Sequence, residues 1–363
     1  MSGARPWLTA KTGGPKGFAS YTPRGWKAGI EQDVLLLIAE LEEADALPVG
    51  PRTVGYRLSM RENVSGLRYV KTNYGADGRP SERVVPGFAT FKDVEDMVKR
   101  LRQAERLDWD AISDGSAVEY PVAGSASLEK FLAELIEHPY QRDLRQGQPV
   151  VVEIYSESAE LTPLIRRVAA EYGVRVYSGR GSGGPDVALG TAISAWNRSL
   201  YHQRTLIFGI GDLDYDGVAG VMRPHVEHVG QFLGGIAERQ GGDPEDTARM
   251  LDFRRIAITP EQAITIAEGL NDPLGVYALR AYRDSGGNDW ERDADLLKFA
   301  PKTEVEALDP VALQDLIRAE IEDILDLDLI RSLRDQETSE GEWLKAELRS
   351  LRDRLCEERE ERP

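Results

Sequence analysis

The clearest indication of the fold is PVVVEIY, residues 149–155. A continuous run of mostly β-branched residues is typical of a strand buried on both faces, as in parallel sheets. Two further runs follow, VRVYSG at 174–179 and RTLIFGIGDLD at 204–214, and helical patterns at 160–173 and 186–202 separate the three. This alternation predicts an α/β fold with a doubly wound parallel sheet.

Acidic side chains follow two of these strands. The segment GDLDYDG places Asp212, Asp214 and Asp216 at the end of the third strand, and Glu157 follows the first. Ligands of such sheets bind beyond the carboxyl ends of the strands. Alternate residues of an extended backbone point the same way, and carboxylate oxygens suit Mg²⁺. The sequence therefore predicts a magnesium site of Glu157, Asp212 and Asp214, with Asp216 as a further candidate.

Other interpretations of the acidic residues stay open. Glu153 is a second candidate ligand, but it lies inside the first strand, where an unpaired charge is costly. A calcium loop would need a glutamate where the chain has Arg223, and plain turn chemistry also places Asp and Gly after a strand. His225 and His228 are three residues apart, a spacing at which two histidines could bind a transition metal. Because no third ligand is evident, a packing role is favoured for both.

The amino-terminal part carries a local basic surplus. Residues 1–28 are predicted to be a flexible basic arm. Residues 29–125 combine three helical patterns with a turn-rich segment, which is compatible with a winged-helix-like domain of three helices and a hairpin. The net charge of the chain is −17, yet residues 51–107 hold 12 Lys and Arg against 7 Asp and Glu. Because phosphate binding depends on a local patch, we expect the DNA-binding residues there: Arg57, Arg61, Lys71, Arg100 and Arg102.

The rest of the chain divides into two predicted parts. Residues 126–335 contain the sheet and its extension, and 336–363 form a charged carboxyl-terminal helix. No apolar run reaches the ~18 residues of a membrane span, and the first residues lack the apolar core of a signal peptide. The single cysteine, Cys356, makes a reducing, cytoplasmic compartment the expectation.

The acidic motif resembles the TOPRIM domain of topoisomerases, primases and some nucleases. Those domains carry a Glu at the end of their first strand and a D-x-D after a later one. The resemblance covers residues 149–221. It implies a Rossmann-like parallel sheet that holds Mg²⁺ through Glu157, Asp212 and Asp214.

The wider chain, residues 30–330, resembles the A subunit of topoisomerase VI, the meiotic double-strand-break proteins and the "mini-A" proteins. PRTVGYRL places Arg52 four residues before Tyr56, as that family does on the helix of its nucleophilic tyrosine. Further similar segments are QPVVVEIYSESAEL, YSGRGSGG and EALDPVALQDLI. Two positions depart from the family pattern: Gly55 stands where an aromatic or hydroxyl residue is usual, and Ser158 where a basic residue is common.

The resemblance implies an enzyme of the type IIB DNA topoisomerase kind. Tyr56 would attack a phosphodiester of double-stranded DNA with Arg52 beside it, and the partner protomer of a homodimer would hold the metal. Such a protein would be nucleoid-associated. No ATP-binding motif occurs in the chain, so a separate ATPase subunit would have to drive strand passage. Two alternatives remain: a metal-dependent nuclease that uses water and leaves Tyr56 idle, and a catalytically inactive DNA-binding protein.

Overall fold

A four-stranded parallel sheet forms the centre of the computed structural model, which describes residues 20–71, 86–113, 125–138, 140–178, 185–213, 222–269 and 303–360. Its strand order is β4-β3-β5-β6, and the strands are β3 (Val150–Ser156), β4 (Arg175–Ser178), β5 (Arg204–Ile210) and β6 (Leu251–Ala257). The α/β prediction and its three strands are confirmed. The chain leaves β3 toward β4 and then returns to the other side of β3, so the strand order reverses between β3 and β5. Ligands of such sheets bind at this reversal.

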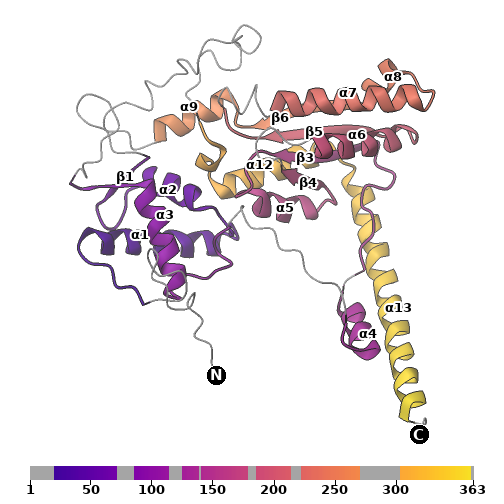
Figure 1. The fold of residues 1–363 in the computed structure, drawn as a ribbon, viewed down its shortest axis with the longest axis horizontal. Helices are drawn as coiled ribbons and strands as arrows, with labels where there is room; N and C mark the ends of the chain where they lie inside the picture. Colours follow the sequence, from indigo (N-terminus) through magenta and orange to yellow (C-terminus); the bar gives the residue numbers. More distant parts are fainter. Residues whose placement is uncertain are drawn as a thin grey trace, which may run out of the picture.

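Helices cover both faces of the sheet (Figure 1). Helices α5 (Thr162–Ala170) and α12 (Pro310–Glu322) lie on one face, and α6 (Pro185–Ser199) and α7 (Arg223–Arg239) lie on the other. Successive side chains of β3 lie on opposite faces of the sheet, which explains this arrangement. Ile154 packs in the core with α5 and α12, and Tyr155 packs on the opposite face. The short helix α8 (Pro244–Ala248) precedes β6, and α9 (Pro260–Gly269) follows it.

The amino-terminal part contains the three expected helices, α1 (Trp26–Glu43), α2 (Pro51–Ser59) and α3 (Phe91–Gln103). Helix α2 begins at Pro51 as predicted, and α3 begins with a capping box in which Thr90 and Asp93 exchange hydrogen bonds. The strands β1 (Arg68–Val70) and β2 (Phe88–Thr90) pair in parallel. This pair is therefore not the antiparallel hairpin of a winged-helix domain.

The amino-terminal helices and the sheet share one hydrophobic core. Val54 and Val94 belong to the same buried cluster as Ile154 of β3 and Leu164 of α5. Arg167 of α5 adds a polar link by donating to the carbonyl of Leu47 at 2.9 Å. The predicted boundary near residue 125 thus does not separate two independent cores.

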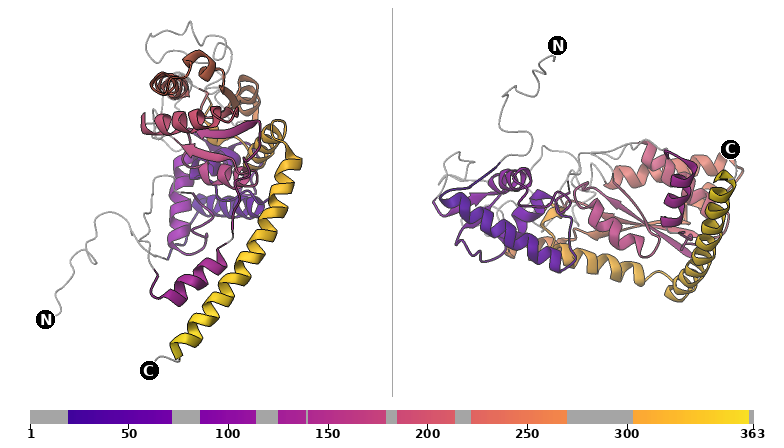
Figure 2. Two further views of the ribbon diagram at one scale, coloured as in Figure 1. Left: turned by 90° about the vertical axis from the view of Figure 1, so that its right-hand side faces the viewer. Right: turned by 90° about the horizontal axis from the view of Figure 1, so that it is seen from below.

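The described carboxyl-terminal residues, 303–360, are mostly helical, as predicted. Helix α12 begins after Asp309, whose carboxylate accepts from the N–H groups of Val311 and Ala312 at 2.8 and 3.0 Å. Helix α13 (Leu327–Glu360) is continuous, so the predicted boundary at residue 335 falls inside it. It extends away from the sheet beside α4 (Leu128–Glu137) (Figures 1 and 2). Within the described residues, no helix has the length and apolar character needed to cross a bilayer.

Candidate active site at the sheet edge

Glu157 and Asp212 meet where β3 and β5 end. These strands are paired to their last residues, Ser156 and Ile210, and the N–H of Glu157 donates to the carbonyl of Ile210 at 2.9 Å. The N–H of Asp212 in turn donates to Oε2 of Glu157 at 3.0 Å. The two residues expected from different strands, Glu157 and Asp212, therefore lie next to each other at the point where the strand order reverses.

Two further contacts fix Asp212. Its Oδ1 accepts from the N–H of Val305 at 2.8 Å, and the guanidinium of Arg255 donates to the carbonyls of Gly211, at 2.7 Å, and of Asp212. The predicted ligands Asp214 and Asp216 lie outside the described residues. In the part of the chain that the structure describes, no three His, Cys, Asp or Glu residues are grouped to hold a metal ion. The described site thus contains two carboxylates of the expected set.

Glu153, the second candidate for the first ligand, has a different environment. It is buried within β3, where it forms ion pairs with Arg198 of α6 at 2.6 Å and with Arg175 of β4 at 3.7 Å. Four residues of strand, roughly 13 Å, separate it from Glu157. Glu153 therefore ties neighbouring elements to β3 and does not lie at the sheet edge.

Tyr56 lies against an acidic segment from the far end of the chain. Its hydroxyl donates to Oε2 of Glu304 at 2.9 Å, and Nζ of Lys71 donates to the Tyr56 oxygen at 3.2 Å. Lys71 also forms an ion pair with Glu304. The next residue, Val305 in the 3-10 helix η4 (Val305–Ala307), is the one whose N–H reaches Asp212. Residues 304–305 thus connect Tyr56 to the carboxylate site within one chain.

Arg52, one turn before Tyr56, lies in the same electrostatic environment. Burial alone would lower the pKa of its guanidinium, but the charges of Glu304, Glu306 and Glu160 outweigh burial and raise that pKa. Arg52 also lines a groove of about 670 Å³ together with Lys99, Arg102 and Trp109. The predicted pair Arg52 and Tyr56 therefore has one member in a groove and one beside the acidic segment.

The two departures from the family pattern have local explanations. A Cβ at Gly55 would lie 2.9 Å from Cγ of Phe91, whose ring packs edge-on against Tyr56 at 4.8 Å between centroids. Only glycine leaves room for that ring. Ser158 is buried, and its hydroxyl donates to Oε1 of Glu306 at 2.7 Å. It therefore joins β3 to the segment that contacts Tyr56.

Each of the predicted DNA-binding cations has a partner in the folded chain. Arg57 pairs with Asp309 at 2.5 Å, and Arg61 donates to Glu40 at 2.9 Å. The other three contact the following groups: Lys71 the Glu304 carboxylate, Arg100 the ring of Tyr21 and Arg102 the ring of Trp109. The net charge of this region could be counted from the sequence, but these partners could not be predicted from it.

The sequence pattern does not mark Glu304, Glu306 or Arg255 as site residues. Glu304 and Tyr56 are 248 positions apart, so no local spacing relates them. The segment EALDP, which begins at Glu306, resembles the family but does not by itself indicate a contact with Tyr56. The alternation of Glu304 and Glu306 across Val305 is the one signal that could have marked this segment.

His225 packs inside the fold. It is fully buried at the start of α7, and its ring stacks on Tyr155 with 4.2 Å between centroids. Burial, assisted by the nearby His228, lowers the pKa of His225 to about 4. This geometry agrees with the packing role favoured from the sequence.

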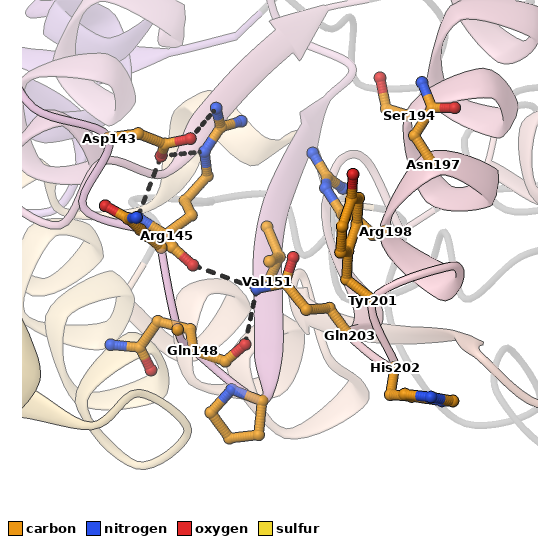
Figure 3. Close-up of a pocket in the computed structure, with 13 residues that line it drawn as sticks. Asp143, Arg145, Gln148, Val151, Ser194, Asn197, Arg198, Tyr201, His202 and Gln203 are labelled. Carbon is orange, nitrogen blue, oxygen red and sulfur yellow. Dashed lines mark hydrogen bonds and ion pairs between the residues drawn. The ribbon is translucent and has the colours of Figure 1, made fainter.

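A second pocket lies at the opposite end of the sheet, at the start of β3 and β5 (Figure 3). Its volume is about 780 Å³, and Asp143, Arg145, Arg198 and Tyr201 are among its lining residues. Its polar groups bond to one another: Arg145 pairs with Asp143 at 2.7 Å, and Gln203 donates to the Arg145 carbonyl at 3.2 Å. The carboxylates of Glu157 and Asp212 follow the other ends of the same strands.

Comparison with protein-family models, curated proteins and solved structures found no match to this chain. The resemblance to topoisomerase VI A subunits therefore rests on the residues of the chain itself and stays a prediction.

Proposed function

We propose that this protein is a DNA-binding, Mg²⁺-dependent transesterase in which Tyr56 cleaves a phosphodiester. One observation carries the proposal: residues 304–305 connect Tyr56 to Asp212, with a 2.9 Å hydrogen bond at one end and a 2.8 Å hydrogen bond at the other. A tyrosine oxygen and strand-end carboxylates near one another are what such a reaction requires.

The reaction exchanges one phosphoester bond for another. The Tyr56 oxygen forms a bond to phosphorus, the bond from phosphorus to one DNA oxygen breaks, and the phenolic proton balances the proton taken up by the leaving oxygen. A phenol with a pKa of ~10 is a weak nucleophile at neutral pH and needs activation. We propose that Lys71, 3.2 Å from the Tyr56 oxygen, and Arg52, one helical turn before Tyr56, stabilise negative charge on the tyrosine and the phosphate.

The donor set fits a hard divalent cation. Glu157 and Asp212 would hold it, and their orientation is fixed because one oxygen of each accepts from a backbone N–H. Bound Mg²⁺ would supply neutralisation of phosphate charge and of the leaving oxygen. Asp214, which lies outside the described residues, is the proposed third ligand.

Double-stranded DNA is the proposed substrate, and a homodimer would bring one tyrosine to each strand. The groove at Arg52, with Lys99 and Arg102 in its walls, is the proposed path of the DNA backbone. The resemblance implies that each tyrosine uses the partner's metal, whereas residues 304–305 connect Tyr56 and Asp212 within one chain. We favour the arrangement within one chain.

A mixed dimer separates these two arrangements. When Tyr56→Phe and Asp212→Asn protomers are combined, an arrangement within one chain leaves no complete site. An arrangement between chains leaves one complete site and restores single-strand cleavage. Restored cleavage would therefore overturn the arrangement we favour.

A second candidate function is metal-dependent hydrolysis by water. The observation in its favour is the burial of Tyr56, which is 1% exposed and so has no open path to DNA in this conformation. Hydrolysis would leave Tyr56 as a packing residue beside Phe91.

Covalent trapping tests the proposal. Labelled duplex DNA is incubated with protein and Mg²⁺, stopped with denaturant and separated by size. The proposal expects labelled DNA to migrate with the wild-type protein and not with Tyr56→Phe. Tyr69→Phe is the matched control, because Tyr69 is also buried but donates to Asp33, at 2.7 Å. Equal cleavage by Tyr56→Phe with free DNA ends would support hydrolysis instead.

A further inference from the structure

The Glu304 carboxylate is surrounded by groups that bind anions. It accepts from the Tyr56 hydroxyl at 2.9 Å and forms an ion pair with Lys71. The charge of Arg52 also acts on it. A hydroxyl and an ammonium in contact with one anionic group, with the guanidinium of Arg52 one helical turn from the tyrosine, are groups that proteins also use to bind a phosphate.

Glu304 also blocks access to Tyr56. The side chain of Glu304 is 16% exposed, that of Lys71 is 31% exposed, and Tyr56 is 1% exposed. In this conformation a phosphodiester cannot reach the Tyr56 oxygen unless the carboxylate moves. The Tyr56 hydroxyl and the Lys71 ammonium would then need another anion as acceptor.

The carboxylate is ionised in its place. Burial works to raise the pKa of Glu304, but the charge and hydrogen bond of Lys71, the Tyr56 hydroxyl and Arg52 outweigh burial and lower that pKa. A buried carboxylate of this kind is tolerated only because it is paired. A phosphodiester carries the same single negative charge and also accepts hydrogen bonds, so it can replace the carboxylate on the same donors.

We infer that Arg52, Tyr56 and Lys71 form a binding site for one DNA phosphate, and that Glu304 fills this site in the DNA-free protein. The inference rests on the proposed function for the identity of the ligand as DNA. Binding of DNA exchanges the carboxylate for a phosphate and uncovers the tyrosine. Because Thr303 pairs with Leu213 and Val305 contacts Asp212, the displaced group belongs to a segment attached to the carboxylate site.

DNA binding without cleavage tests the exchange. Fluorescence anisotropy of a labelled duplex is measured in EDTA for the wild type and for Glu304→Gln, which keeps the shape and removes the charge. We expect about tenfold tighter binding, since the phosphate no longer competes with a charge-assisted contact. Glu320→Gln is the matched control, because Glu320 pairs with Arg254 on the surface and its loss changes the net charge equally.

A double-mutant cycle assigns the effect to this site. Lys71→Ala should weaken DNA binding, and Glu304→Gln should improve binding less in the Lys71→Ala protein than in the wild type. Equal gains in both backgrounds would overturn the inference. Unchanged or weaker binding by Glu304→Gln would also overturn it, and would leave Glu304 as a residue that only orients Tyr56.

The DNA-binding test of the phosphate site can fail or succeed independently of the covalent-adduct test of the proposed transesterase. Tighter binding by Glu304→Gln together with no covalent adduct in the wild type would retain the phosphate site and reject the transesterase. Thermal unfolding checks that each variant folds. If Glu304→Gln does not fold, Glu304→Asp shortens the side chain by one methylene and should still tighten binding, by a smaller factor. Unchanged affinity of Glu304→Asp would then count against the exchange.

Discussion

Gly55→Ala tests the packing that holds Tyr56 in place. The new Cβ would lie 2.9 Å from Cγ of Phe91 and 3.2 Å from both Cδ atoms. Phe91 cannot easily move away, because it is buried and packs edge-on against Tyr56. Overpacking of this kind costs about 1–3 kcal/mol. Alanine favours the helix by about 1 kcal/mol relative to glycine, so we expect the free energy of unfolding to fall by roughly 1 kcal/mol overall.

Urea denaturation of four variants, Gly55→Ala, Gly190→Ala, Phe91→Leu and the Gly55→Ala/Phe91→Leu double variant, measures this balance. Gly55→Ala should lower the free energy of unfolding. Gly190→Ala is the matched control, because Gly190 lies inside α6 and a Cβ there meets nothing within 4 Å, so this change should raise stability. Adding Phe91→Leu to Gly55→Ala should cost less than the sum of the two single changes, since the smaller side chain relieves the contact. If Gly55→Ala stabilises the protein as much as Gly190→Ala does, the packing argument is wrong.

Three further predictions concern the metal, the DNA and pH. Asp212→Asn keeps an acceptor for the N–H of Val305, so it should preserve the fold but reduce Mg²⁺ binding in calorimetry and abolish Mg²⁺-dependent cleavage; unchanged Mg²⁺ binding would reject the site. Charge reversal of Arg102, which lines the groove at Arg52, should weaken duplex binding for any sequence and reduce its salt dependence, whereas reversal of the exposed Arg249 should not. Burial lowers the pKa of His225 to about 4, whereas a histidine in the unfolded chain binds its proton near pH 6.5. Because the unfolded chain then binds more protons than the folded chain, the free energy of unfolding should fall as pH drops from 6.5 toward 4, by up to roughly 3 kcal/mol. His225→Phe should remove that part of the pH dependence of Tm, and an unchanged profile would contradict this account.

The sheet and the Glu157–Asp212 pair could be predicted because their signals are local. The buried runs 149–155 and 204–214 differ in period from the helical patterns between them, and parallel strands in a doubly wound sheet end on one edge. The same reasoning favoured Glu157 but left Glu153 as a candidate, since a charge inside a buried strand needs partners. Arg198 and Arg175 supply those partners.

The contacts around Tyr56 could not be predicted, because they join distant parts of the chain. Helical spacing relates Arg52 to Tyr56, but nothing near either residue indicates Glu304 or Phe91. The same limit applies to β1 and β2, where a turn-rich segment suggested a hairpin and the strands pair in parallel. Counting the basic residues of 51–107 likewise gave a net charge but not the ion pair of Arg57 with Asp309.

Identification of the residue that carries DNA after cleavage tests whether Tyr56 is the nucleophile. Wild-type protein is incubated with duplex DNA and Mg²⁺, denatured, digested with nuclease and protease, and its peptides are analysed by tandem mass spectrometry. If Tyr56 is the nucleophile, a nucleotide is joined through phosphate to Tyr56 in the wild type and is absent from Glu157→Gln, whose metal site is impaired. DNA that is cut without any phosphotyrosyl peptide, or a nucleotide on a different tyrosine, would contradict this role of Tyr56.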